Sequence, residues 1–252
     1  MKVSIITVCR NAKRTIGRAF DSISSQTYPY VEKIIIDGLS FDGTQEVVKR
    51  YLKPCDKFIS EADSGIYDAM NKGVALATGD IIYFLNADDS LYDKDVLTDI
   101  VKEFSSYNDR AIIYGKVLYE TSNKRHNSYP PIFQFHALKD FMHHTLCHQA
   151  VFAKRDVFLS IGGFDLKYRL AADKDWFIRA YKHVSKSFVY VDRVIANYNY
   201  FGQSFQYKKQ CIQEAEMIIW RHFSLSDFLL YWIRYSFLRA MKRRILNRGL
   251  YS

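Results

Sequence analysis

Apolar residues in the first hundred positions follow two alternating patterns. Short continuous runs, such as Val3 to Val8 and Ile81 to Leu85, are typical of strands buried on both faces of a sheet. Between these runs, apolar residues recur at helical spacing, as in Ile16, Phe20 and Ile23. The pattern predicts strands over residues 3–8, 34–36, 57–60 and 81–85, and helices over 16–23, 46–51, 66–77 and 96–104.

Repeated strand–helix units predict an α/β fold with a mostly parallel, doubly wound central sheet flanked by helices. Ligands of such sheets bind beyond the carboxyl ends of the strands. We therefore expect the polar residues that end the predicted strands to meet at one rim of the sheet. These residues are Thr7, Cys9, Asn11, Asp37, Glu61, Asp63, Asp88 and Asp89.

The second half of the chain is less regular. Its patterns predict strands over residues 112–119 and 149–153, with one or two more within 187–200. They predict a short helix that follows residue 153 and ends at Ile161, and further helices over residues 172–181, 206–223 and 226–246. Residues 120–147, rich in Asn, His, Tyr and Pro, support no prediction.

Composition adds charge and redox environment to this picture. The 252 residues carry a formal net charge of +9, and 48% are hydrophobic, as in ordinary globular proteins. The basic balance favours phosphate-bearing substrates or an anionic membrane surface, while the acidic rim argues against nucleic acid. Four scattered cysteines without a C-x-x-C pair, and no signal peptide before Val3, predict free thiols in the cytoplasm.

Asp88 and Asp89 follow a predicted buried strand. Two adjacent carboxylates repel each other unless something neutralises them, and Mg²⁺ or Mn²⁺ prefers carboxylate and phosphate oxygens. The alternative is that one Asp caps the following helix. The pair alone leaves both interpretations open.

Two other polar segments suggest contacts with a ligand. An Asp at a strand end, such as Asp37, can accept hydrogen bonds from a base or ribose, although a simple turn gives the same pattern. Asp63 and Gly65 stand at a predicted helix start, where backbone N–H groups favour anions. Asp68 and Lys72 are four apart and can pair on one helix face, as they also would on a solvated face.

A third segment offers a general base. Asp173 and Asp175 lie beside Trp176, and a carboxylate next to an aromatic wall can take a proton from a hydroxyl. The alternative is that these acids only stabilise a helix start. His148 and Gln149 predict polar contacts near a substrate.

Six segments together resemble the family-2 inverting glycosyltransferases with the GT-A fold, of the kind found in bacterial polysaccharide biosynthesis. The resemblance covers roughly residues 1–205, with the segments in the family's order and spacing. They are Val3–Asn11, Ile36–Thr44, Glu61–Gly73, Asn86–Asp89, Gly162–Asp165 and Ala171–Trp176.

The resemblance implies a glycosyltransferase domain over residues 1–205, with a donor half (1–110) and an acceptor half (111–205), and C-terminal helices over 206–252. It implies Mg²⁺ or Mn²⁺ on Asp88 and Asp89, and acceptor-side contacts from His148, Gln149 and Trp176. The donor contacts that it implies are Thr7, Cys9, Asn11, Asp37, Asp63, Asp68, Asn71, Lys72, Asn86 and Ala87.

Two positions depart from the family's pattern. Asn86 stands at the first position of the D-x-D motif, so the metal would rest chiefly on Asp88. Ala172 replaces the usual Glu before the base, which leaves Asp173 and Asp175 as candidates. The alignment of the motif favours Asp173.

The implied activity is metal-dependent transfer of a hexosyl group by single displacement. The donor is a nucleotide sugar, with UDP favoured, and the acceptor is a hydroxyl of a saccharide or lipid-linked saccharide. One rival is a sugar-nucleotide nucleotidyltransferase, but residues 9–13 lack the glycine-rich phosphate loop of that class. The second rival is a non-catalytic nucleotide-sugar-binding protein.

The C-terminal segment suggests a membrane contact. Its apolar stripe is interrupted by Arg234 and is too short to cross a bilayer of about 30 Å. An aromatic, basic, amphipathic helix suits the inner face of the cytoplasmic membrane, although it could equally pack on the domain. The stripe comprises Leu225, Phe228, Leu229, Trp232 and Tyr235.

Overall fold

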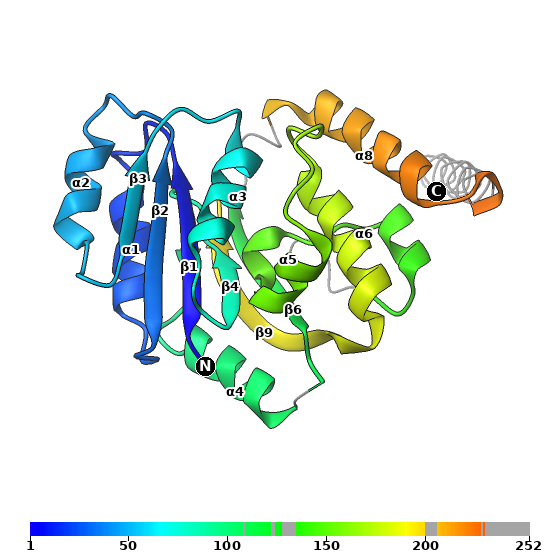
Figure 1. The fold of residues 1–252 in the computed structure, drawn as a ribbon, viewed down its shortest axis with the longest axis horizontal. Coiled ribbons are helices and arrows are strands. Elements are labelled where there is room, and N and C mark those ends of the chain that lie inside the picture. Colours follow the sequence, from blue (N-terminus) through cyan, green and yellow to red (C-terminus); the bar gives the residue numbers. More distant parts are fainter. Residues whose placement is uncertain (108, 122–123, 128–134, 200–205, 228, 230–252) are drawn as a thin grey trace, which may run out of the picture.

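The computed structural model describes residues 1–107, 109–121, 124–127, 135–199, 206–227 and 229. Its nine strands form one sheet (Figure 1). The strands are β1 (Val3–Cys9), β2 (Val31–Asp37), β3 (Lys57–Ser60), β4 (Ile81–Phe84), β5 (Ser90–Leu91), β6 (Ile112–Thr121), β7 (Lys124–Asn127), β8 (Val151–Lys154) and β9 (Phe188–Tyr198).

Seven α-helices and three short 3₁₀ helices lie among the described residues. The α-helices are α1 (Ile16–Ser24), α2 (Thr44–Tyr51), α3 (Ile66–Leu76), α4 (Val96–Ser106), α5 (Arg155–Ile161), α6 (Ala172–Val184) and α8 (Lys208–His222). The 3₁₀ helices are η1 (Leu138–Met142), η2 (His148–Ala150) and η3 (Ser185–Ser187).

The strand order β3-β2-β1-β4-β8-β6-β9-β5 divides the sheet into two parts. The first four strands are parallel, with Ile6 paired to both Ile34 and Phe84, so their carboxyl ends share one rim. In the second part, β8 is antiparallel to β4 and β6, whereas β6 and β9 run parallel. The expected parallel arrangement therefore holds for the first half of the chain, and the complete sheet is mixed.

Alternate side chains of each strand pack into one or the other of two hydrophobic clusters, one on each face of the sheet. Ile34 and Ile36 pack with apolar residues of α3, α5 and α6, whereas Ile35 packs with those of α1, α2 and α4. This alternation follows from the two-residue repeat of a strand. Helices consequently cover both faces of the sheet, as the continuous apolar runs predicted.

The helix α8 lies beside α6 at the side of the molecule away from β3 (Figure 1). Its Ile218 is fully buried and joins the cluster that contains α6. The predicted helix over residues 206–223 is therefore present with slightly shorter bounds. The helix expected over residues 226–246 lies almost wholly outside the described residues. None of the described helices is long and apolar enough to cross a membrane.

Candidate active site

The carboxyl ends of β1 and β4, the segment before α3, and parts of α6 and α8 line one cleft of about 1110 Å³. This placement matches the expectation that the strand ends of the parallel half share a site. Ten of the residues selected from the sequence line the cleft. They are Cys9, Asn11, Asp63, Asn86, Ala87, Asp88, Asp89, His148, Gln149 and Asp173.

The carboxylates of Asp88 and Asp89 differ in their surroundings. Asp89 is 1% exposed and accepts hydrogen bonds from Gln149 Nε2 at 2.8 Å and from the backbone of Asn199 at 2.8 Å. Burial, followed by the charge of Asp88, raises the pKa of Asp89 to about 7. Asp88 is only partly buried and accepts one hydrogen bond from Asn199 Nδ2 at 2.9 Å. The cleft is therefore lined by one buried and one partly exposed acid side by side.

A histidine connects this motif to α6. Asn86 Nδ2 lies 3.1 Å from His148 Nε2, and His148 Nδ1 lies 3.3 Å from Asp173 Oδ2. With the amide nitrogen of Asn86 facing Nε2, the ring proton belongs on Nδ1, which donates to Asp173. Asn86 Oδ1 is buried and accepts no hydrogen bond from any residue that the structure describes. This oxygen is available to a bound group in the cleft.

Asp37 is the last residue of β2 and is not among the residues that line the cleft. Its fully buried carboxylate accepts hydrogen bonds from the backbone and hydroxyl of Ser40 and from Ser60 Oγ. Ser40 Oγ in turn accepts from the backbone N–H of Asn11 at 2.7 Å, and Asn11 adopts a left-handed backbone with φ of 53°. Through Ser40, Asp37 thus supports the loop that carries Asn11 into the lining of the cleft. Thr7 is likewise buried, inside β1.

The three residues selected on α3 form contacts outside the cleft. Lys72 Nζ lies 2.8 Å from Glu61 Oε1 and 3.7 Å from Asp68 Oδ2, which is the pairing expected of a helix face. Asn71 exchanges two hydrogen bonds with the backbone of Phe164, at 2.8 and 2.9 Å. Asn71 therefore ties α3 to the Gly162–Asp165 segment that precedes α6.

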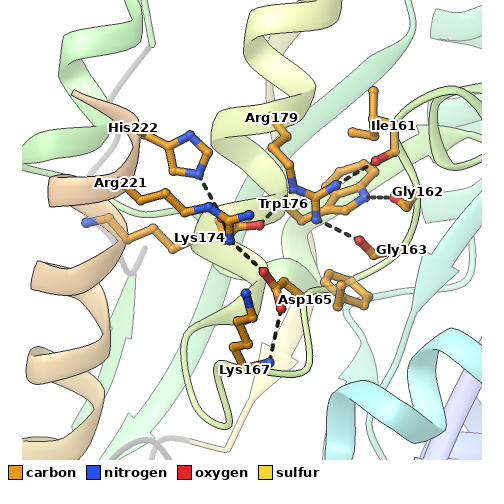
Figure 2. A network of polar contacts seen from close by, with 12 residues as sticks. Ile161, Gly162, Gly163, Asp165, Lys167, Lys174, Trp176, Arg179, Arg221 and His222 are labelled. Carbon is orange, nitrogen blue, oxygen red and sulfur yellow. Dashed lines mark hydrogen bonds and ion pairs between the residues drawn. The ribbon is translucent and has the colours of Figure 1, made fainter. Parts of the chain in front are cut away.

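Asp175 and Trp176 are not among the residues that line the cleft. They belong to a network of polar contacts in which Trp176, Arg179 and His222 can be followed in Figure 2. Asp175 is fully buried and accepts hydrogen bonds from Arg179 Nε and His222 Nε2, both at 2.7 Å. Burial by itself raises the pKa of Asp175, but these hydrogen bonds outweigh it and the pKa is lowered. Trp176 Nε1 donates to the carbonyl of Gly162 at 3.0 Å. Of the two candidate bases, only Asp173 reaches the cleft.

The structure adds site residues that the sequence patterns did not select. Arg169 lies in the loop before α6, and Lys174 follows Asp173 on α6. Both line the cleft. Glu214 of α8 is 7% exposed, and its Oε2 accepts the backbone N–H groups of Leu170 and Ala171 at 2.8 and 3.1 Å. No motif contained Glu214, because its contact depends on how α8 folds back on α6.

Comparison with known proteins places this architecture in a family. Residues 4–159 match the family model described as glycosyl transferase family 2. The chain is a member of glycosyltransferase family 2. A PGL/p-HBAD biosynthesis glycosyltransferase of Mycobacterium bovis is 34% identical over 202 residues, which cover 79% of this chain and 77% of that protein. The family predicted from the motif order is therefore confirmed.

Solved structures show that this family-2 glycosyltransferase has the GT-A fold. Residues 1–349 of S. aureus TarS in complex with UDP-GlcNAc superpose with a TM-score of 0.68 at 19% identity, covering 80% of this chain and 59% of that one. A mannosyltransferase of Pyrobaculum calidifontis in complex with GDP-Man and Mn²⁺ gives a TM-score of 0.57 at 20% identity, covering 77% of this chain and 55% of that one.

The side-chain oxygens at the end of β4 are of the kind that bind a hard cation together with substrate oxygens. Asp88 contributes a partly exposed carboxylate, and Asn86 Oδ1 is a buried oxygen without a hydrogen-bond donor among the described residues. Within the same residues, no group of three or more His, Cys, Asp or Glu side chains is arranged to hold a metal ion. Mg²⁺ and Mn²⁺ sites of this kind use one or two carboxylates together with substrate phosphates.

Proposed function

We propose that this glycosyltransferase moves a hexosyl group from a nucleotide sugar, with UDP-sugars as the first candidates, to an acceptor hydroxyl with inversion of configuration. Membership of family 2 supports the reaction class. The likeness to structures that hold UDP-GlcNAc or GDP-Man supports a nucleotide-sugar donor. Residues 1–110 would provide the donor half of the domain and residues 111–205 the acceptor half, followed by C-terminal helices over 206–252.

One observation carries the proposal. The motif at the end of β4 and the N-terminal turn of α6 line one cleft and are joined through Asn86, His148 and Asp173. A single displacement needs a diphosphate site and a proton acceptor on opposite sides of the anomeric carbon. The cleft contains both kinds of residue.

In this mechanism Asp173 takes the proton from the acceptor hydroxyl. His148 donates to Oδ2 of Asp173 and thereby fixes the orientation of the carboxylate. Asp88, Asp89 and Asn86 would hold Mg²⁺ or Mn²⁺, which when bound offsets negative charge on the departing nucleoside diphosphate. Asn11 and Asp63 line the part of the cleft beside β1 and would contact the nucleotide, in a loop that Asp37 supports.

The acceptor would be a saccharide or lipid-linked saccharide at the inner face of the cytoplasmic membrane. The surface of α8 supports a peripheral membrane contact, because Ile212, Met217 and Trp220 are each at least 50% exposed. Lys209 is also exposed on this helix. Apolar and basic side chains together favour an anionic interface. Co-sedimentation with anionic vesicles that is equal for the wild type and Trp220→Ala would refute this contact.

A panel of nucleotide sugars tests the proposed function. Melting temperatures are measured with UDP-, GDP- and dTDP-sugars, with Mn²⁺ or with EDTA, and nucleoside diphosphate release is followed with simple saccharide acceptors. We expect a UDP-sugar to stabilise the protein only with the cation present. Asp88→Ala should lose this shift, and Asp173→Asn should keep it while losing turnover.

The matched control is Asp156→Asn, which changes an exposed acid in the first turn of α5 outside the cleft. It should behave as the wild type. Release of pyrophosphate from a nucleoside triphosphate and a sugar phosphate would favour the nucleotidyltransferase. Binding without turnover for every donor and acceptor would favour the non-catalytic protein.

A further inference from the structure

Lys174 is a buried basic residue; burial lowers its pKa to about 8, although the charge of Asp173 acts in the opposite direction. The residue is 8% exposed and lines the cleft, directly after the proposed base. Its ammonium forms no hydrogen bond or ion pair with any residue that the structure describes, whereas its backbone N–H donates to Asp173 Oδ1. Burying an unpaired charge is costly, so a site of this kind favours an anionic ligand.

The position of Lys174 separates it from the donor side of the cleft. Figure 2 shows its side chain extending from α6 toward α8. Burial raises the pKa of the Cys211 thiol on α8, and the nearby charge of Lys174 opposes this rise, which agrees with the direction of the side chain in Figure 2. Asp88 and Asp89, in contrast, lie at the end of β4. Under the proposed function the donor diphosphate would lie beside these two acids, and the α6–α8 side has a separate basic group.

Two further cations line the same side. Arg169 precedes α6 and Lys208 begins α8; both are exposed, and both line the cleft. Neither side chain forms a hydrogen bond or ion pair with another described residue. The nearby Glu214 is engaged by backbone N–H groups of Leu170 and Ala171. The three basic side chains are thus all available to a ligand.

We propose that Lys174, with Arg169 and Lys208, binds a phosphate group of the acceptor next to the hydroxyl that Asp173 deprotonates. The inference rests on the proposed function and specifies the acceptor as a phosphate ester. Several cations around one phosphate form charge-assisted hydrogen bonds that a neutral saccharide cannot offer. The phosphate could belong to a lipid carrier or to the saccharide, and both present the same group to Lys174.

Isothermal calorimetry with two soluble probes tests the proposal. Geranyl phosphate represents a lipid phosphate and glucose 6-phosphate a phosphorylated saccharide, with geraniol and glucose as their neutral counterparts. Each titration is run with and without saturating UDP and Mn²⁺. We expect at least one phosphate to bind the wild type and its neutral counterpart to bind at least tenfold more weakly. Binding of geranyl phosphate alone would assign a lipid carrier, and binding of glucose 6-phosphate alone a phosphorylated saccharide.

The variants separate charge from folding. Lys174→Met removes the ammonium but keeps most of the apolar chain, and it should bind the phosphate at least tenfold more weakly, whereas Lys174→Arg should stay within threefold. Lys167→Met is the matched control, because Lys167 lies on the exposed loop before α6 and outside the cleft. Arg169→Gln, at an exposed position where folding is not at risk, should weaken binding severalfold.

Three results would overturn the proposal. They are equal phosphate affinity in the wild type and Lys174→Met, failure of both phosphates to bind the wild type, and a fall in UDP affinity in Lys174→Met, which would place the cation on the donor side. Failure of the proposed function is distinguishable, because it would appear as a wild type that no UDP-, GDP- or dTDP-sugar stabilises, while phosphate binding is measured separately.

Discussion

His148 Nδ1 lies 3.3 Å from Asp173 Oδ2, and this contact connects two segments that are 25 residues apart in the sequence. The side chains are 15% and 17% exposed, so water competes only weakly for the contact. The other ring nitrogen faces Asn86 at 3.1 Å. The imidazole is therefore held on both sides and sets the direction of the Asp173 carboxylate.

Removing this contact should lower turnover more than donor binding. We expect His148→Ala to reduce kcat by about 10- to 100-fold, because small misplacements of a catalytic group cost rates of this order. The KM for the donor should change less than threefold. Steady-state kinetics with saturating acceptor measures both values.

Two isosteric replacements make this test specific. In His148→Asn the amide nitrogen can occupy the place of Nδ1 and keep the bond to Asp173, so most of the activity should remain. In His148→Gln the amide can replace only Nε2, so the loss should match that of the alanine variant. Equal activity in the Asn and Gln variants would argue against an orienting role for His148.

Glu214 should support the base from α8. Its carboxylate accepts two backbone N–H groups immediately before α6, at Leu170 and Ala171. Glu214→Ala leaves both donors without this acceptor, so we expect a loss of about 1–3 kcal/mol in the free energy of unfolding, together with a lower kcat. Glu214→Gln retains an acceptor oxygen and should recover most of both. Urea denaturation measures the free energy of unfolding, and steady-state kinetics on the same preparations measures kcat. A Glu214→Ala variant with unchanged stability would contradict the supporting role of Glu214.

The first half of the site could be predicted from the sequence because local patterns fix it. Buried parallel strands read as apolar runs, and polar residues that follow such a run, as Asp88 follows β4, are expected at the ligand-binding rim. The choice between Asp173 and Asp175 could not be made in this way. Side chains two positions apart on a helix point about 200° apart, so only the packing of α6 decides which of them faces the cleft.

The contacts of α8 likewise could not be predicted from the sequence. Helical spacing shows which face of α8 is apolar, but it does not show which element that face meets. Glu214 reads as an ordinary helix acid until α8 packs beside α6 and brings it to Leu170, which is 44 residues away. Lys174 likewise reads as a solvated lysine, but it is 8% exposed in the folded protein.

Asp175→Asn should damage folding rather than catalysis. The fully buried carboxylate holds Arg179 of its own helix and His222 of α8, so its removal leaves a partly buried cation unpaired. Loss of one partner of a buried ion pair costs about 3–5 kcal/mol. We expect a loss of this order in urea denaturation, whereas Asp173→Asn should change stability by less than about 1 kcal/mol. If Asp175→Asn folds as stably as the wild type but has no turnover, the two aspartates have the opposite roles.

Glu32 should make the stability of the parallel sheet depend on pH. Its carboxylate, 1% exposed, accepts hydrogen bonds from Ser4 Oγ, Thr78 and Lys2, which join β1, β2 and the turn before β4. Burial by itself raises the pKa of Glu32, but these bonds outweigh it and lower the pKa from 4.5 to about 2. Since the folded pKa is depressed, the stabilisation is complete above pH 4.5 and is lost as the pH falls toward 2. Urea midpoints between pH 6 and pH 3 should therefore fall more steeply for the wild type than for Glu32→Gln, and parallel curves would contradict the assignment.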